Sequence, residues 1–255
     1  MEKAFVIILV GLVLSIFISG CAQQGVYSQQ TQTSGQTTSS GTGRAVFAIT
    51  DAAANIGSVT SVKVTINSIK VHSTTEGWVA VSSTPKTYDL LRLKSESKQE
   101  LLADAELKEG TYDQIRLDIS NVVVTDAEGT HEAKLPSGEL KISGNLVVKA
   151  NSTSTATFDF VADESLHVTG NGKYIMAPVI QVETREDADV DVESNNKVEV
   201  KGGKIHTNVR VGMDAEGNVG VGLRIPENIN LSIDSGGIIK VGGKGSGKIG
   251  IGIEG

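Results

Sequence analysis

Three aspartates are the residues whose positions suggest metal chemistry. Asp51, Asp159 and Asp163 are expected at strand ends or in loops, where carboxylates from separate strands could converge on Ca²⁺. Calcium takes about six to eight oxygen ligands, so these side chains are its weak candidates in this chain. The alternative is that each carboxylate caps a turn through its side-chain oxygen, which needs no metal. No other cofactor is expected.

Motifs for catalysis are missing from the sequence. The histidines are scattered along the chain, and no two of them have the spacing of zinc ligands. There is no Gly-x-Ser-x-Gly nucleophile elbow, no P-loop and no dinucleotide-binding fingerprint. The chain is therefore expected not to be an enzyme.

Cys21 is the only cysteine of the chain and follows an apolar run that extends from Ala4 to Phe17. As a helix, residues 4–20 would reach only about 25 Å, short of the ~30 Å hydrocarbon core that a stable span needs. This length favours an export signal. Residues 18–21 have the form of a lipobox, the prokaryotic lipoprotein signal that ends in an acylated cysteine.

The start of the chain therefore predicts a signal peptide at residues 1–20 and a lipid on Cys21 that binds the membrane. An uncleaved membrane anchor or an ordinary signal peptide are the alternatives. Residues 21–43 are rich in Gln, Ser, Thr and Gly. Because this composition cannot bury enough apolar area, we expect a disordered tether. The predicted location is the outer face of a bacterial or archaeal membrane.

Composition limits the partners. The net charge of −7 argues against nucleic acid, because phosphate binding needs clustered Lys and Arg. Cations, glycans and proteins remain as candidate ligands. Since Cys21 is the only cysteine, the exported body has no disulfide and must be stable through burial alone.

Residues 44–185 alternate apolar and polar side chains with a period of two, which is typical of strands. Only the short segment Lys98–Leu107 is predicted to be helical. Many short strands with regular turns predict an all-β fold, an antiparallel β-sandwich. The expected strands are residues 45–49, 59–71, 78–81, 115–119, 122–124, 140–142, 146–148, 153–160, 166–168 and 174–182, with turns at 126–129, 136–138 and 170–172.

The acidic residues 186–193 predict a domain boundary after Arg185. Residues 186–255 pair glycine with aliphatic residues, as in Val219–Leu223 and Ile249–Ile253. Strand alternation would then place the glycines on one face. Turns at Asp214–Asn218 and Gly242–Gly247 favour two hairpins, so we expect a Gly-rich hairpin appendage that could pack on the sandwich or pair with another copy.

Residues 44–185 resemble the domain-of-unknown-function 4382 family, which occurs in exported bacterial and archaeal proteins. The resemblance implies an exported β-rich domain and no activity, because the family is uncharacterised. The residues that carry it are Ile49–Ala52, Trp78, Tyr88–Leu91, Gly110–Leu117, Leu135–Gly138, Phe158–Phe160 and Lys173–Ile180.

A few single residues have two interpretations. Trp78 could stack on a sugar ring, but its alternating strand favours a buried core position. Arg116, between Ile115 and Leu117, is expected to face solvent. Asn151 and Asn230 begin glycosylation sequons, which matter only in a host that glycosylates exported proteins.

Together these features predict a lipid-anchored, non-catalytic surface protein. It would serve as a structural or adhesive module that binds protein or glycan through loops distal to the tether. One alternative is an envelope enzyme that acts on polysaccharide with two carboxylates as acid and base. Another is a surface component that self-assembles through the Gly-faced C-terminal strands.

Overall fold

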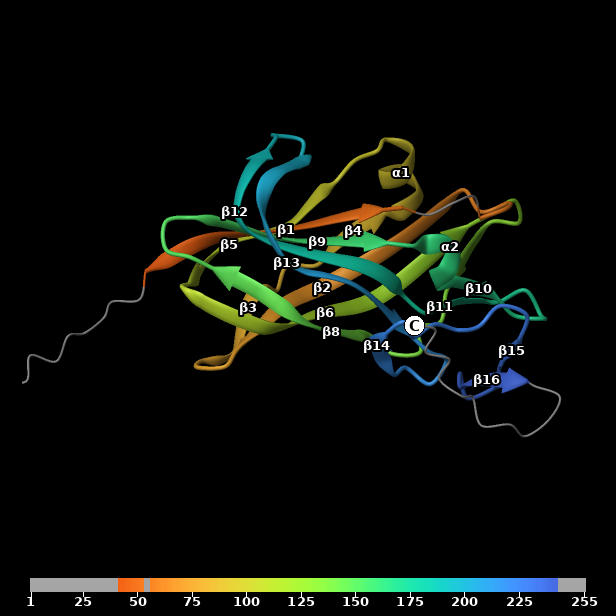
Figure 1. Cartoon of the computed structure of the whole chain (residues 1–255). Helices are drawn as coiled ribbons and strands as arrows, with labels where there is room; N and C mark the ends of the chain where they lie inside the picture. The colour runs from red at the N-terminus through yellow and green to blue at the C-terminus, as the bar shows by residue number, and fades with distance from the viewer. Residues whose placement is uncertain (1–40, 53–55, 243–255) are drawn as a thin grey trace, which may run out of the picture. The chain divides into compact units, whose positions relative to one another are not determined.

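The computed structural model describes residues 41–52 and 56–242, and in this part of the chain almost every element is a strand. The all-β prediction is confirmed. The helices are α1 (Leu90–Ser95) and α2 (Ala162–Ser165). The strands are β1 (Thr42–Asp51), β2 (Ser61–Ser73), β3 (Gly77–Ser82), β4 (Lys86–Asp89), β5 (Glu100–Lys108), β6 (Gly110–Thr125), β7 (Thr130–Glu132), β8 (Glu139–Val148), β9 (Thr153–Phe160), β10 (Leu166–Val168), β11 (Tyr174–Met176), β12 (Val179–Val192), β13 (Val198–Met213), β14 (Val219–Val221), β15 (Asn230–Ile233) and β16 (Ile239–Gly242) (Figure 1).

Two six-stranded sheets contain most of these strands. The first has the order β14-β13-β12-β9-β1-β5. The second has the order β3-β2-β6-β7, with β4 paired to β2 and β8 paired to β6. Pairing is antiparallel between the described strands except for β1 and β9, which run parallel. A parallel pair needs a long connection, and the second sheet is built from that connection.

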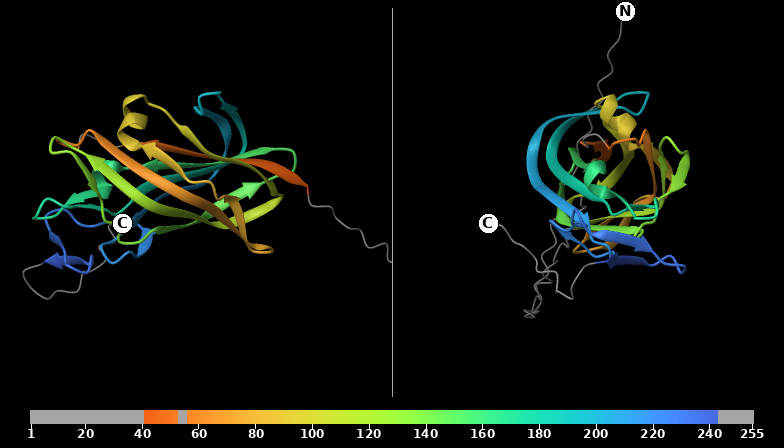
Figure 2. Two further views of the ribbon diagram at one scale, coloured as in Figure 1. Left: turned by 180° about the vertical axis from the view of Figure 1, so that it is seen from behind. Right: turned by 90° about the vertical axis from the view of Figure 1, so that its right-hand side faces the viewer.

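The two sheets curl around one hydrophobic core (Figure 2). Phe47 and Phe158 contribute to it from the first sheet, and Ile115 and Leu140 from the second. All four side chains are buried. The rest of this core is mainly Val, Ile, Leu and Ala, as expected for a chain with only 4% aromatic residues. Burial of the alternate side chains on each strand is what joins the sheets.

The helical interpretation of residues 98–107 is wrong. Residues 100–108 form β5, which pairs antiparallel with β1. The helix lies earlier, where the Asp89 side chain accepts a hydrogen bond from the Arg92 backbone amide at 3.4 Å and caps α1. Pairing with a buried strand has therefore overridden the local helical preference of the later segment.

The boundary predicted after Arg185 falls inside β12, so the chain does not leave the first sheet there. Residues 186–192 form the second half of β12, and β13 pairs with β12 along its length. The turn expected at Asp214–Asn218 connects β13 to β14, with the Asp214 amide donating to the Asn218 carbonyl at 3.0 Å. Only β15 and β16 form a separate hairpin among the described C-terminal residues.

Several predictions concern residues outside the described ranges. They are the signal peptide at 1–20, the lipid on Cys21, most of the tether and the second C-terminal hairpin beyond residue 242. Strand β1 begins at Thr42, so the tether predicted at 21–43 ends slightly earlier than expected. Within residues 41–52 and 56–242, no helix combines the length and hydropathy needed to cross a bilayer.

The far end of the β12–β13 hairpin folds back over the outer face of β1. Val46 and Ala48 point to that face and are buried there together with Val198. The partly buried residues packed against them are Leu101, Val190, Val192 and Val200. We call this group the outer cluster. It explains why the hairpin cannot be a loosely attached appendage, because its apolar face is buried against β1.

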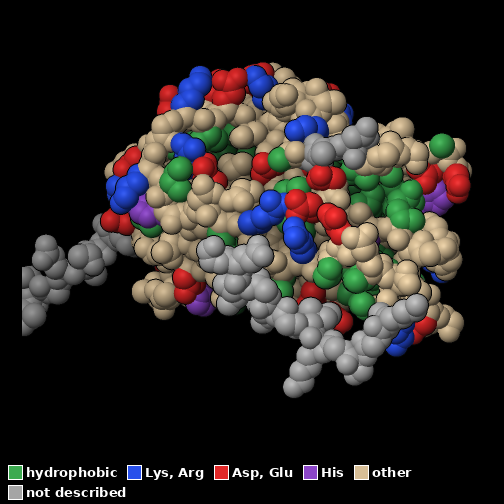
Figure 3. Space-filling view, turned by 45° about the vertical axis from the view of Figure 1, so that its right-hand side comes forward, with side chains coloured by type: hydrophobic (Ala, Val, Ile, Leu, Met, Phe, Trp, Pro, Cys, Tyr) green, Lys and Arg blue, Asp and Glu red, His purple; other side chains and the backbone are tan. Residues whose placement is uncertain are grey.

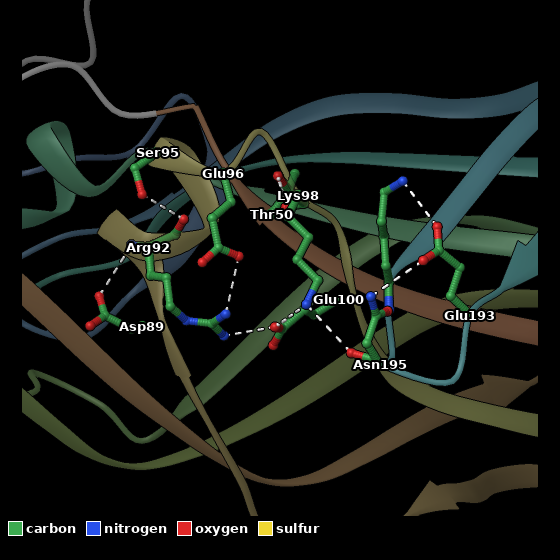
Figure 4. Close-up of polar contacts among 10 residues, drawn as sticks. Thr50, Asp89, Arg92, Ser95, Glu96, Lys98, Glu100, Glu193 and Asn195 are labelled. Carbon is green, nitrogen blue, oxygen red and sulfur yellow. Dashed lines mark hydrogen bonds and ion pairs between the residues drawn. The ribbon is translucent and has the colours of Figure 1, made fainter.

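Polar contacts hold the tip of the same hairpin (Figure 4). The Glu100 carboxylate on β5 accepts from Arg92 of α1 at 2.7 Å and from Lys98 at 2.8 Å. Lys98 also donates to the Asn195 carbonyl of the hairpin turn at 3.4 Å. Burial raises the pKa of Glu100, but the bonds from Lys98 and Arg92 outweigh this effect and lower it. The carboxylate is thus held charged between α1, β5 and the hairpin.

Two adjacent glycines give a matched test of the fold-back. Gly202 and Gly203 both have positive φ, 62° and 76°. A Cβ on Gly203 would lie 2.8 Å from the Glu186 carbonyl oxygen, whereas one on Gly202 meets nothing within 4 Å. Gly202→Ala should lower the free energy of unfolding by about 1–2 kcal/mol, the usual cost of a left-handed residue. Gly203→Ala should lower it by a further 1–3 kcal/mol or so, because it is also overpacked.

Urea denaturation of both variants checks this difference. Equal losses in the two variants would show that the close approach of β12 to Gly203 does not constrain the hairpin.

Candidate functional site

The aspartates proposed for calcium lie on neighbouring elements but do not form a ligand set. Asp51 is buried at the end of β1, and its Oδ1 accepts from the Ala162 amide at 3.2 Å. Asp159 stands on β9 beside Thr50, and burial raises its pKa above the usual carboxyl range. Asp163 is in α2. No group of three or more His, Cys, Asp or Glu residues in the described part of the chain is placed to hold a metal ion. The calcium hypothesis thus gains no support from this arrangement.

Both sequon asparagines are exposed. Asn151 lies in the turn between β8 and β9 with a positive φ of 57°, and Asn230 is the first residue of β15. Their modification stays a prediction.

Trp78 is not in the core, contrary to the expectation from its strand. Its relative exposure is 40%, the opposite of a core tryptophan. Strand β3 lies at the edge of the second sheet, and its partly buried Val79 and Val81 pack against the core. Because side chains alternate along a strand, Trp78 must point to the outer face. The sequence Trp-Val-Ala-Val is apolar on both faces, so alternation alone could not tell which face is buried.

Neighbouring strands surround the indole with charged side chains. The Arg116 guanidinium carbon lies 4.1 Å from the centre of the Trp78 ring, a cation–π contact. Glu139 on β8 forms an ion pair with Arg116 at 2.9 Å. The His72 ring centre is 5.1 Å from that of Trp78, and His72 Nδ1 lies 2.7 Å from Asp113 Oδ1. We call these five residues the Trp78 face.

The Trp78 face can bind a ligand that is part apolar and part polar. Its contacts with Arg116 and His72 limit the rotamers of the indole. The residue as a whole still has a relative exposure of 40%. Asp113 and Glu139 are each engaged by a basic side chain.

A concave region lies at the end of the body that carries α2 and β10. It is a cleft of about 430 Å³ between α2, β10 and residues 224–231. Glu164 at its edge forms ion pairs with Arg210 at 2.5 Å and Arg224 at 3.6 Å. Burial lowers the pKa of His167 in its wall, which keeps this imidazole neutral. Nothing in the sequence indicated this cleft, because its walls come from distant parts of the chain.

Charged side chains of both signs lie next to one another at several places on the surface in Figure 3.

Hydrogen bonds to Asp126 close the turn predicted at residues 126–129. Asp126 Oδ1 accepts from the amides of Glu128 and Gly129 at 2.8 and 3.1 Å. Tyr174 donates its hydroxyl to Asp126 Oδ2 at 2.6 Å, and His131 lies 3.2 Å from Oδ1. The Tyr174 bond, followed by these others, lowers the pKa of Asp126 to about 2.

This depressed pKa predicts a specific loss of stability in acid. A carboxylate whose pKa is lower in the folded than in the unfolded state stabilises the fold at pH values above its unfolded-state pKa, which is near 3.8 for Asp126. This contribution is lost as the pH falls towards the folded-state pKa of about 2. Asp126→Asn should therefore be less stable than the wild type at pH 5.5, and the difference should shrink at pH 2.5. Urea midpoints at the two pH values measure it. Glu216→Gln, in an exposed part of another turn, is the control, and a difference for Asp126→Asn that does not change with pH would contradict the assignment.

Comparison with known proteins identifies the family. The model of a protein family described as Domain of unknown function (DUF4382) matches residues 42–178, which is more than half of the chain. No curated protein and no solved structure gave a significant match. The matched range ends before β12, so it covers the whole second sheet and the Trp78 face but not the hairpin of the outer cluster.

Proposed function

Because the chain belongs to the DUF4382 family, whose function is unknown, we propose its role from the geometry alone: a lipid-anchored envelope protein that binds glycan through the Trp78 face and catalyses no reaction. The observation that carries this proposal is the 40% exposure of Trp78 among ordered polar side chains. The C–H face of a sugar ring packs on an indole, and its hydroxyl groups need hydrogen-bonding partners beside it. Arg116, Glu139, His72 and Asp113 provide such groups.

The exposure of Trp78 on the outer face of the second sheet supports a binding role for the Trp78 face. A tryptophan combines a large apolar ring with a polar N–H group, and tryptophans are enriched at binding interfaces for that reason. The same sheet buries its other face completely in the core, since Val71, Ile115 and Leu117 are at most 1% exposed. The exposed tryptophan is therefore not a consequence of loose packing.

The predicted lipid on Cys21 sets where this surface would work. Some twenty tether residues would hold the body about 25 Å from the bilayer as a coil. Trp78 lies near the end of the body where β1 begins. Thr42 pairs with Lys108, which forms an ion pair with Glu76, two residues before Trp78. The candidate site is thus near the start of β1, and not in the distal loops that the sequence suggested.

The alternatives use other parts of the molecule. An envelope enzyme acting on polysaccharide would use the cleft near α2, where Asp163, Glu164 and Glu227 supply carboxylates. The arginines that pair with Glu164 favour a structural role for that side chain. Self-assembly would use the edge strand β14, where Val221 is 71% exposed. Size-exclusion chromatography tests this last alternative.

Replacement of the tryptophan tests the proposal directly. Trp78→Ala should weaken glycan binding at least tenfold, or about 1.4 kcal/mol, whereas Trp78→Phe should keep part of the affinity. A glycan and cell-wall polysaccharide array finds the ligand, and titration of that ligand measures the loss. Circular dichroism should show an unchanged fold for both variants. Unchanged binding by a folded Trp78→Ala protein would remove the Trp78 face from consideration.

The anchor has its own test. Cys21→Ser removes the acylated sulfur, so the protein should move from the membrane fraction to the soluble fraction of the exporting host. Detergent extraction of the wild type, with mass spectrometry of its N-terminal peptide, is the matched measurement. A Cys21→Ser protein that stays with the membranes would argue for an uncleaved hydrophobic anchor.

A further inference from the structure

Three basic side chains form a row across the second sheet beside Trp78. Lys70 on β2 lies directly opposite Arg116 on β6, and Arg116 lies opposite Lys141 on β8. All three point to the outer face, because Ile69, Val71, Ile115 and Leu117 between them are buried in the core. We call Lys70, Arg116 and Lys141 the cationic row.

Such a row is unfavourable for the sheet itself. Adjacent strands are about 4.8 Å apart, and like charges directly opposite one another are destabilising. One carboxylate, that of Glu139, contacts two members of the row, Arg116 at 2.9 Å and Lys141 at 3.2 Å.

Lys70 is the member of the cationic row whose charge is not balanced by an ion pair with a described residue. It is exposed and forms no ion pair with any residue in the described ranges. Two further carboxylates lie on this part of the face, Asp118 in the next row opposite Ser68 and Asp113, which lies 2.7 Å from His72. The positive charge is concentrated in the cationic row itself, where among the described residues Glu139 contacts Arg116 and Lys141 but no carboxylate contacts Lys70.

The cationic row is next to the tryptophan. Trp78 pairs with His72, and Lys70 stands two residues before His72 on the same strand and the same face. The distance from Lys70 to His72 is about 6–7 Å along the strand, close to the width of one sugar ring. A ring stacked on Trp78 would therefore have its substituents over Lys70 and Arg116, which also contacts the indole.

From this charge complementarity we infer that the ligand of the Trp78 face is an acidic polysaccharide, with sugar carboxylates bound by the cationic row and Lys70 as their main contact. The inference rests on the proposed glycan binding and names its ligand class. A neutral glycan would leave the charge of Lys70 uncompensated, whereas a carboxylate would supply the missing counter-charge.

Matched polymers and matched lysines test this inference. The full chain in detergent is titrated with polygalacturonate and alginate, and with their neutral methyl-esterified forms. The wild type should bind at least one of the carboxylated polymers about tenfold more tightly than its ester, and 0.5 M salt should reduce that preference. Lys70→Gln should weaken binding of the acidic polymer about fivefold or more and leave binding of the ester unchanged. Lys63→Gln is the control. Lys63 is exposed on the same strand, but its register partners on the neighbouring strands are Asp89 and Val123, so it lies outside the cationic row.

The outcomes separate this inference from the proposed function. Equal, Trp78-dependent binding of acidic and esterified polymers would overturn the acidic ligand and keep the glycan-binding proposal. An equal effect of Lys63→Gln and Lys70→Gln, or equal binding of dextran sulfate by wild type and Trp78→Ala, would show non-specific attraction of polyanions and overturn the inference. Binding of a neutral glycan alone would also overturn it. Failure of every polymer to bind in a Trp78-dependent manner would overturn both.

Discussion

Burial of β1 on both of its faces is the constraint on which the rest of the structure depends. Phe47 and Ile49 point into the main core, while Val46 and Ala48 point outwards and are covered by the outer cluster. An uncovered outer face would expose apolar side chains in the middle of a sheet, at a cost proportional to their area. The long β12–β13 hairpin, its positive-φ glycines and the contacts of Glu100 all serve to keep that cover in place.

The two sheets differ because only one of them is covered on the outside. The first sheet carries its own hairpin over β1, whereas the second presents Lys70, Trp78 and Lys141 to solvent. An uncovered sheet face is normally polar, and most of this one is. Trp78 and Lys70, which has no ion pair among the described residues, are the residues that a purely structural face would not need, and both lie near His72. This coincidence is the reason for proposing a ligand surface on the second sheet.

Electrostatics plays a local part in this protein. Asp126, Glu100 and Glu139 each fix one connection through short hydrogen bonds or ion pairs. Partly exposed pairs such as Arg116–Glu139 contribute little to stability, and most of the folding free energy must come from Val, Ile and Leu burial. The lack of disulfides and the low aromatic content agree with that division. The charges therefore define local geometry more than they define stability.

The sequence by itself determined the all-β class, most strand positions and the turns at Asp126–Gly129 and Asp214–Asn218, because alternation and turn residues are local signals. It also determined the resemblance to the family, and it contains the motif from which a lipid on Cys21 is predicted. Tertiary structure alone decided that residues 100–108 are a strand, that the hairpin beyond Arg185 belongs to the first sheet, and that Trp78 points outwards. The physical reason is the same in each case. Which face of a strand is buried, and which charges stand opposite one another as Lys70, Arg116 and Lys141 do, depends on pairing between segments far apart in the chain, and no local pattern records that register.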